Sequence, residues 1–292
     1  MKDTLAFTRR NLSVFFRDRA QVSLALLSAL ILLAIYGLFL GNLQVDALKA
    51  ALPNADTADV QWFVNTWVLA GTTMITTVTA SIAGIATFVE DRASGRFKDF
   101  VVTPVHRSSL TLGYLAATFV IAFALTLVVL LVGQVYLLTQ GQSTMDAGQL
   151  AAAVGYCALS CAAFSALASF IVSFVRSSGA YSSLATIVGT AIGFLAGAFI
   201  TPGLLPEGVA TTLAALPFMH AAMLVRIPFT ADALSALTGG QAEAIESLSE
   251  TYGITSSVND LVISPAIAMG SLVVVAALFT VLGGWRVSRT IR

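Results

Sequence analysis

Charged side chains are scarce in this sequence. Of its 292 residues, 15 are Lys or Arg and 15 are Asp or Glu, so only 10% are charged, whereas 57% are hydrophobic. Soluble domains carry about 25% charged residues, and a water-soluble core cannot absorb this much apolar sequence. We therefore predict an all-α polytopic membrane protein. The formal net charge of +0 gives no general attraction to nucleic acid, and we expect no such partner.

Cysteine is almost absent. Cys157 and Cys161 are the two cysteines of the chain, and they lie four positions apart in an apolar run. That spacing could place two metal ligands on one helix face, but the run holds no His, Asp or Glu to complete a site. We interpret both as small packing residues and infer neither a metal site nor a disulfide framework.

Motifs for chemistry are missing too. The sequence contains no HExxH, no GxSxG and no clustered carboxylates, so it shows no machinery for a membrane enzyme and no catalytic residue. The phosphate-binding pattern GxxxxGK[ST] does not occur, and we do not expect the chain to hold ATP or another cofactor in that way.

Long apolar runs are what the sequence does contain, and they predict six transmembrane helices. Each run offers at least the 20 or so residues that cross a bilayer as a helix. The predicted spans are 21–41, 61–89, 110–138, 150–175, 180–200 and 261–285. None has an ionisable residue in its interior, although proton- and ion-coupled carriers usually need such groups near the bilayer midplane.

Two further segments flank or interrupt these spans. At 1–20, apolar residues can share one helical face beside arginines, which predicts an interfacial amphipathic helix. At 201–260, the stretch Gly208 to Val225 is apolar but interrupted by Pro217, and each half is too short to cross a bilayer. We predict a re-entrant extracellular hairpin here, whose backbone must be covered by protein. The acidic part at 232–260 has no evident role.

The positions of Lys and Arg predict the orientation. If both termini, the loop after the second span and Arg176 lie in the cytoplasm, only Lys49 and Arg226 among the basic residues lie outside. Such a bias is typical of cytoplasmic segments. Small residues at Gly189, Gly193 and Gly197 permit close helix contact, and we favour contact within the chain over contact between two chains.

Hydroxyl groups are frequent in the second span. Thr72, Thr73, Thr76 and Thr77 follow one another within two turns of helix. In membrane helices such groups usually bond their own backbone or a neighbouring helix. The sharper alternative is that these four threonines line a substrate path.

A dense patch of mixed charge separates the second and third spans. We predict that 90–107 is a cytoplasmic loop held close to the membrane. Within it, Phe97, Phe100 and Val101 recur at helical spacing, and Gly95 interrupts the pattern, which indicates a short amphipathic helix. The alternative is a solvated loop without a partner.

The order of these features resembles the integral-membrane permease of a type-2 ABC exporter. Members often show a Glu-x-x-x-Gly stretch followed by Thr-Pro in the first cytoplasmic loop. Here Glu90-Asp91-Arg92 and Gly95 precede Thr103-Pro104, and Glu90 stands one residue off that spacing. The resemblance covers essentially the whole chain. It implies a location in a bacterial or archaeal plasma membrane and a drug-, antibiotic-, lipid- or glycan-like substrate.

The resemblance also implies partners. Two permease chains, identical or similar, would pair with two separate ATPase subunits that hold ATP and Mg²⁺. The loop would dock on the ATPase through a set of coupling residues. These are Glu90, Asp91, Arg92, Gly95, Arg96, Phe97, Phe100 and Val101. An ion-coupled carrier or channel, and a non-transporting membrane scaffold, are the alternatives.

Overall fold

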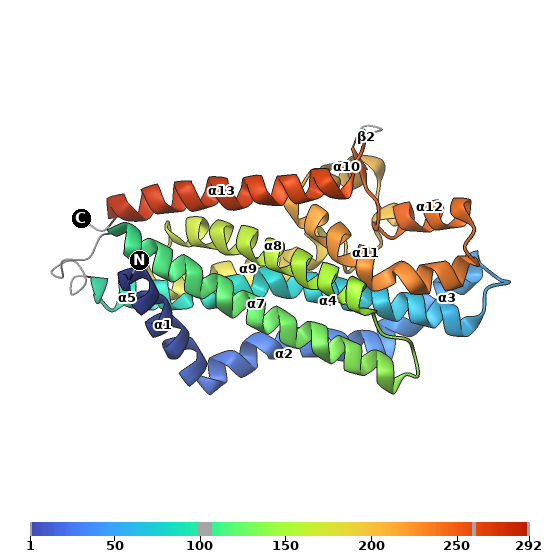
Figure 1. Ribbon diagram of the computed structural model, residues 1–292, viewed down its shortest axis with the longest axis horizontal. Coiled ribbons are helices and arrows are strands. Elements are labelled where there is room, and N and C mark those ends of the chain that lie inside the picture. The colour runs from blue at the N-terminus through green and yellow to red at the C-terminus, as the bar shows by residue number, and fades with distance from the viewer. Residues whose placement is uncertain (1, 98–106, 259–260, 291–292) are drawn as a thin grey trace.

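The computed structural model of the chain describes residues 2–97, 107–258 and 261–290. Nearly all of these residues are helical, and the long helices run along the long axis of the molecule (Figure 1). By length and composition, six of the described helices could cross a membrane. They comprise Thr57–Ala93, Ser108–Thr139, Ala147–Val172, Ser178–Leu195, Pro217–Thr238 and Pro265–Arg286. The prediction of an all-α polytopic membrane protein is confirmed.

The N-terminal part of the chain bends sharply at Asp18. Helices α1 and α2 meet there at 76°, and as one bent pair they would make a seventh crossing. The Asp18 side chain starts α2 by accepting a hydrogen bond from a backbone N–H of its first turn. The elements are α1 (Lys2–Arg17), α2 (Arg19–Ile35), the π-helical turn η1 (Tyr36–Leu40) and α3 (Gly41–Ala51). The membrane position of α1 stays a prediction.

Helix α4 forms the centre of the molecule. In its apolar window 89% of the residues are buried, and it packs against α7, α8 and α11. The following elements are α4 (Thr57–Gly84), α5 (Ala86–Ala93), α7 (Arg107–Thr139), α8 (Ala147–Val172) and α9 (Ser178–Leu195). Asp56, Asp146 and Ser177 cap the N-termini of α4, α8 and α9. Local side chains therefore help to determine where these helices begin.

The last third of the chain contains a pair of helices, a short hairpin and the final long helix. Strands β1 and β2 pair in antiparallel fashion, with Ser257 opposite Val262. The elements are η2 (Pro202–Leu204), α10 (Glu207–Ala214), α11 (Pro217–Thr238), α12 (Ala242–Thr251), β1 (Ser257–Val258), β2 (Leu261–Val262) and α13 (Pro265–Thr290).

Helix α11 corrects one expectation about the segment 201–260. We expected Pro217 to divide two helices that are each too short to span. Pro217 instead occupies the first turn of α11, where a missing N–H costs nothing, and the helix runs for 22 residues to a left-handed C-cap at Gly239. It is long and apolar enough to cross a membrane. Only α10, with 8 residues, is too short.

Different elements lie at the two ends of the molecule. Both chain termini lie at one end, beside α5, whereas α3 and α12 lie at the other end (Figure 1). Helix α5 therefore shares its end of the molecule with α1 and with the C-terminal part of α13. Cys157 and Cys161 lie far from any surface, fully buried on α8.

Candidate functional site

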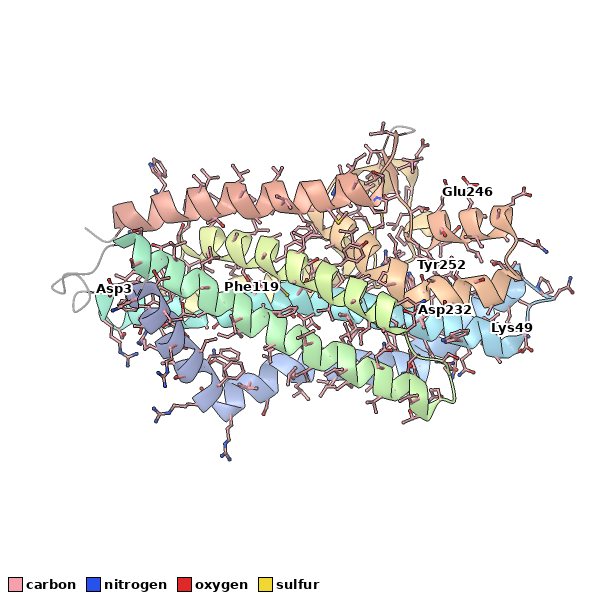
Figure 2. The ribbon with its side chains drawn as sticks, viewed as in Figure 1. Asp3, Lys49, Phe119, Asp232, Glu246 and Tyr252 are labelled. Carbon is pink, nitrogen blue, oxygen red and sulfur yellow. The ribbon has the colours of Figure 1, made fainter. Side chains whose placement is uncertain are left out.

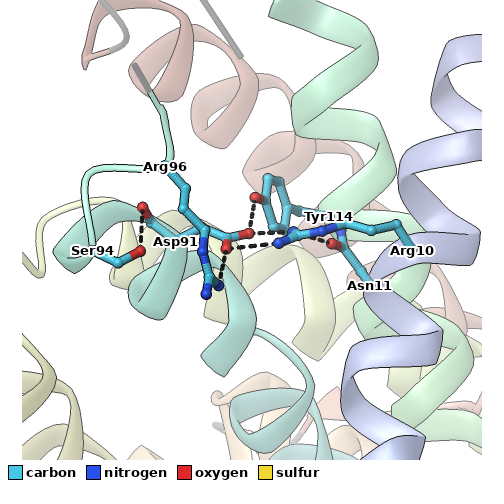
Figure 3. A network of polar contacts seen from close by, with 6 residues as sticks. All are labelled: Arg10, Asn11, Asp91, Ser94, Arg96 and Tyr114. Carbon is cyan, nitrogen blue, oxygen red and sulfur yellow. Dashed lines mark hydrogen bonds and ion pairs between the residues drawn. The ribbon is translucent and has the colours of Figure 1, made fainter. Parts of the chain in front are cut away.

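A buried carboxylate organises the charged end of the molecule. Asp91 lies on α5 and is completely buried. Figure 3 shows how three side chains from other segments converge on it. Arg10 of α1 donates to both carboxylate oxygens, the second at 2.8 Å. The Tyr114 hydroxyl of α7 donates at 2.6 Å, and Arg96 donates at 3.2 Å from the turn after α5.

The carboxylate is therefore matched by donors on every side. Two guanidinium groups and a phenol satisfy its oxygens, which is what a buried charge requires if it is not to destabilise the fold. The hydrogen bonds from Arg10 to Asp91 also hold the pKa of that guanidinium above its ordinary value, even though partial burial opposes this. We call Arg10, Asp91, Arg96 and Tyr114 the Asp91 cluster. It ties α1, α5 and α7 into one unit.

An aromatic layer supports the Asp91 cluster. The ring centroids of Phe88 and Tyr114 are 5.3 Å apart, and Phe97 lies 5.3 Å from Phe88 and 6.2 Å from Tyr114, all in edge-to-face geometry. Such aromatic pairs add about 0.5–1.5 kcal/mol each beyond the area that they bury. Phe97 thus fastens the start of the charged loop to α5 and α7.

The next residue of α5 makes a second tie. Arg92 donates to the backbone carbonyls of Ser173 and Val175, both at 2.9 Å. These carbonyls lie just past the C-terminal end of α8, where a cation is favoured by the helix dipole. The turn that follows depends on Gly95, whose φ of 77° is left-handed and strained for other residues.

The predicted coupling residues divide into three groups in the structure. Glu90 and Arg96 are exposed, while Arg92, Gly95 and Phe97 are half-buried. Asp91 was expected at a docking surface. It is instead fully buried, and its carboxylate accepts hydrogen bonds from side chains of the same chain. Phe100 and Val101 lie outside the described residues.

The four threonines of the second span do not face any opening. Thr72, Thr73, Thr76 and Thr77 are each at most 2% exposed. Each hydroxyl donates to a carbonyl three or four residues earlier in α4, at 2.7–2.9 Å. These contacts are the local backbone bonding that is usual for hydroxyl groups in membrane helices. Their burial in the central helix gives no support to a path lined by these residues.

The glycines of the fifth span behave differently from one another. A Cβ on Gly193 would collide with the Phe199 ring, and one on Gly197 would lie 2.7 Å from Pro202. Both positions thus pack within the chain, as favoured from the sequence. A Cβ on Gly189 would meet nothing within 4 Å, and this exposed glycine lines a small cavity between α9 and α4.

Arg226 forms a buried polar site that the sequence did not indicate. Arg226 was expected on the extracellular side, which stays a prediction; the structure adds that this residue of α11 is fully buried. Its guanidinium donates to the carbonyls of Gly253, Ala196 and Gly197 at 3.1, 3.1 and 2.6 Å, and its Cζ lies 5.3 Å from the centroid of the Trp67 ring. Because its acceptors are backbone carbonyls, no side-chain motif could have revealed this site.

Comparison with known proteins identifies a family that matches this chain. The family described as ABC-2 type transporter matches residues 2–229, which contain α1, the Asp91 cluster and most of α11. No curated protein matches the chain.

Proposed function

Because the chain belongs to the ABC-2 type transporter family, we propose that it is the permease of an exporter driven by a separate ATPase subunit. The match over residues 2–229 is the observation that carries this proposal. It includes α1, α5 and the start of α7, which lie at the end of the molecule where an ATPase would dock. The substrate would be drug-, antibiotic-, lipid- or glycan-like, as the resemblance of the sequence implies.

The Asp91 cluster gives this proposal a mechanical form. An ATPase that contacts the exposed residues Glu90 and Arg96 would push on the turn after α5. Since Asp91 joins that turn to α1 and α7, the push would move three helices together. Arg92 would pass the same displacement to the end of α8. The inward side of α5 would transmit the motion, and its outward side would meet the partner.

We place a second permease chain against the outward face of α9. In its apolar window only 11% of the residues are buried, the lowest share among the six candidate spans, yet α9 is less apolar than α7, α8 or α13. A helix that faced lipid on nearly all sides should be among the most apolar. Small and hydroxyl-bearing residues on this face would let another helix approach closely. They include Ser182, Ser183, Thr186, Gly189 and Thr190.

Copurification from the native membrane tests the proposed function. The tagged chain should bring down an ATPase that mass spectrometry identifies, and the pair in proteoliposomes should hydrolyse ATP faster than the ATPase alone. The exposed Glu90→Lys should weaken the association, while Glu246→Lys, exposed on α12 at the other end, should not. A chain that is isolated without an ATPase and transports down an ion gradient would show an ion-coupled carrier instead.

A further inference from the structure

A sizeable cavity lies at the end of the molecule opposite the two termini. Its volume is about 820 Å³, within the range of about 300–1,000 Å³ that is usual for small-molecule sites. Residues of α3, of the segment 52–55, of η2, of the end of α11 and of α12 form its walls. None of these elements takes part in the Asp91 cluster, so the cavity is separate from the site described above.

Helix α12 gives the acidic segment 232–260 a role in this cavity. The residues of α12 that line it are Ala244, Ser247, Leu248 and Thr251, which recur at helical spacing and form one uncharged face. Glu243, Glu246 and Glu250 are exposed on a different face of the same helix. The sequence thus keeps the carboxylates of α12 out of the cavity.

The lining is mainly apolar, includes several uncharged polar side chains, and carries no charge. No Lys, Arg, Asp, Glu or His is among the residues that line the cavity in the part of the chain that the structure describes. Gln44, Asn54 and Gln241, which carry side-chain amides, are among the residues that line it. Among the hydrogen bonds of the described residues, none involves the side chain of Gln44, Asn54 or Gln241. Leu48, Leu237 and other apolar side chains supply the remaining wall.

We propose that this cavity binds a neutral saccharide, either free or as the headgroup of a lipid. Each sugar hydroxyl both donates and accepts hydrogen bonds, and a side-chain amide offers two donors and an acceptor in return. The C–H faces of a sugar ring would pack against the leucines. A phosphate or carboxylate would lose its hydration without gaining a counter-charge, so anionic ligands are disfavoured. The proposal does not depend on transport or on an ATPase.

Binding to the full chain in lipid nanodiscs tests this inference. The probes are maltotriose in solution and a monoglucosyl diacylglycerol in the disc, compared with sialyllactose and phosphatidylglycerol. Gln44→Leu combined with Gln241→Leu should weaken binding of the neutral probe by about tenfold or more, because two hydrogen-bonding groups are lost. Ser247→Trp should abolish binding by filling the cavity.

Matched controls separate ligand contacts from damage to the fold. Asn42→Leu on α3 and Glu246→Trp on α12 change exposed residues that do not line the cavity, and they should bind as the unmodified chain does. All variants should show the same melting temperature. Binding of maltotriose or of the glycolipid decides which source of saccharide is used. The proposal is overturned if neither neutral probe saturates, if the anionic probes bind equally well, or if Ser247→Trp leaves binding unchanged.

Discussion

The Tyr114 hydroxyl donates a 2.6 Å hydrogen bond to Asp91 Oδ2, across the 23 positions that separate the two residues in sequence. Asp91 lies on α5 at the start of the segment 90–107 and Tyr114 follows that segment on α7, so this bond joins the two helices on either side of it. Arg10 reaches the same carboxylate from α1. Motion of α1 or α7 relative to α5 would therefore require that a buried charge lose a donor.

Asp91→Asn should destabilise the protein while leaving its shape unchanged. The amide cannot accept from all three donors, and it leaves the Arg10 guanidinium without its counter-charge. We expect a loss of about 2–3 kcal/mol, somewhat below the usual cost of breaking a buried ion pair because Arg10 is 30% exposed. Thermal unfolding in detergent measures it. Glu90→Gln, at the exposed neighbouring position, should change the melting temperature little, and an equal effect at both positions would contradict the role of Asp91.

The limits of the sequence are clearest at Glu90, Asp91 and Arg92. These neighbours look alike as a charged patch, but each successive residue of a helix points about 100° away from the last. One therefore faces solvent, one faces α1 and α7, and one faces the end of α8. The donors Arg10 and Tyr114 lie 81 and 23 positions away, so only the folded chain reveals which of the three is buried.

Helix positions were better predicted than helix ends. The long apolar runs are local signals, and long helices form over most of them. The side-chain caps at Asp56, Asp146 and Ser177 had not been predicted. Pro217 was misleading because the same residue that ends one helix can begin another. Arg226 was misleading because its burial depends on carbonyls of α9 and of the turn at Gly253, which no local pattern encodes.

Arg226→Met should lower stability although it removes a buried charge. Methionine fills much of the same space, but the carbonyls of Ala196, Gly197 and Gly253 lose a shared donor. Unsatisfied buried acceptors cost about 1–3 kcal/mol each before relaxation, so we expect a total loss of about 2–4 kcal/mol.

Arg226→Lys should rescue little of this loss, because an ammonium group lacks the planar fork that reaches several acceptors at once. Arg176→Met, at an exposed position, is the control and should melt like the unmodified chain. Thermal unfolding followed by tryptophan fluorescence measures all three variants. If Arg226→Met proves as stable as the parent, the guanidinium does not hold α9 and α11 together.

Thiol labelling should reveal the orientation of the chain. A cysteine at Glu246, exposed on α12, should react with an impermeant maleimide in intact cells, whereas a cysteine at Arg176, also exposed, should react only after the membrane is opened. Cys157 and Cys161 are fully buried and should contribute no background. If Arg176→Cys is labelled in intact cells and Glu246→Cys is protected, the orientation of the chain is opposite to the one predicted.

Phe97→Ala should uncouple ATP hydrolysis from transport without unfolding the permease. Phe97 is the described residue through which the start of the charged loop packs on Phe88 and Tyr114, and its removal costs two aromatic contacts of about 0.5–1.5 kcal/mol each. That loss is small compared with the free energy that holds the long helices together. It is large compared with the few contacts that hold the start of the charged loop on α5 and α7. When the ATPase moves, the loop should therefore move by itself and should no longer displace α5 and α7.

Reconstituted complexes of the chain with its copurified ATPase test this uncoupling. For Phe97→Ala we expect ATP hydrolysis to persist while ATP-driven uptake into inverted vesicles, measured with a compound that copurifies, falls by about tenfold. Phe97→Tyr keeps the ring and should transport normally, and Phe39→Ala, at an exposed position in η1, is the control for loss of a phenyl group. Phe100→Ala can be added to Phe97→Ala, since both were predicted to anchor the loop. If the double variant transports at the parental rate, the segment 90–107 is a passive linker, and force must enter the permease elsewhere.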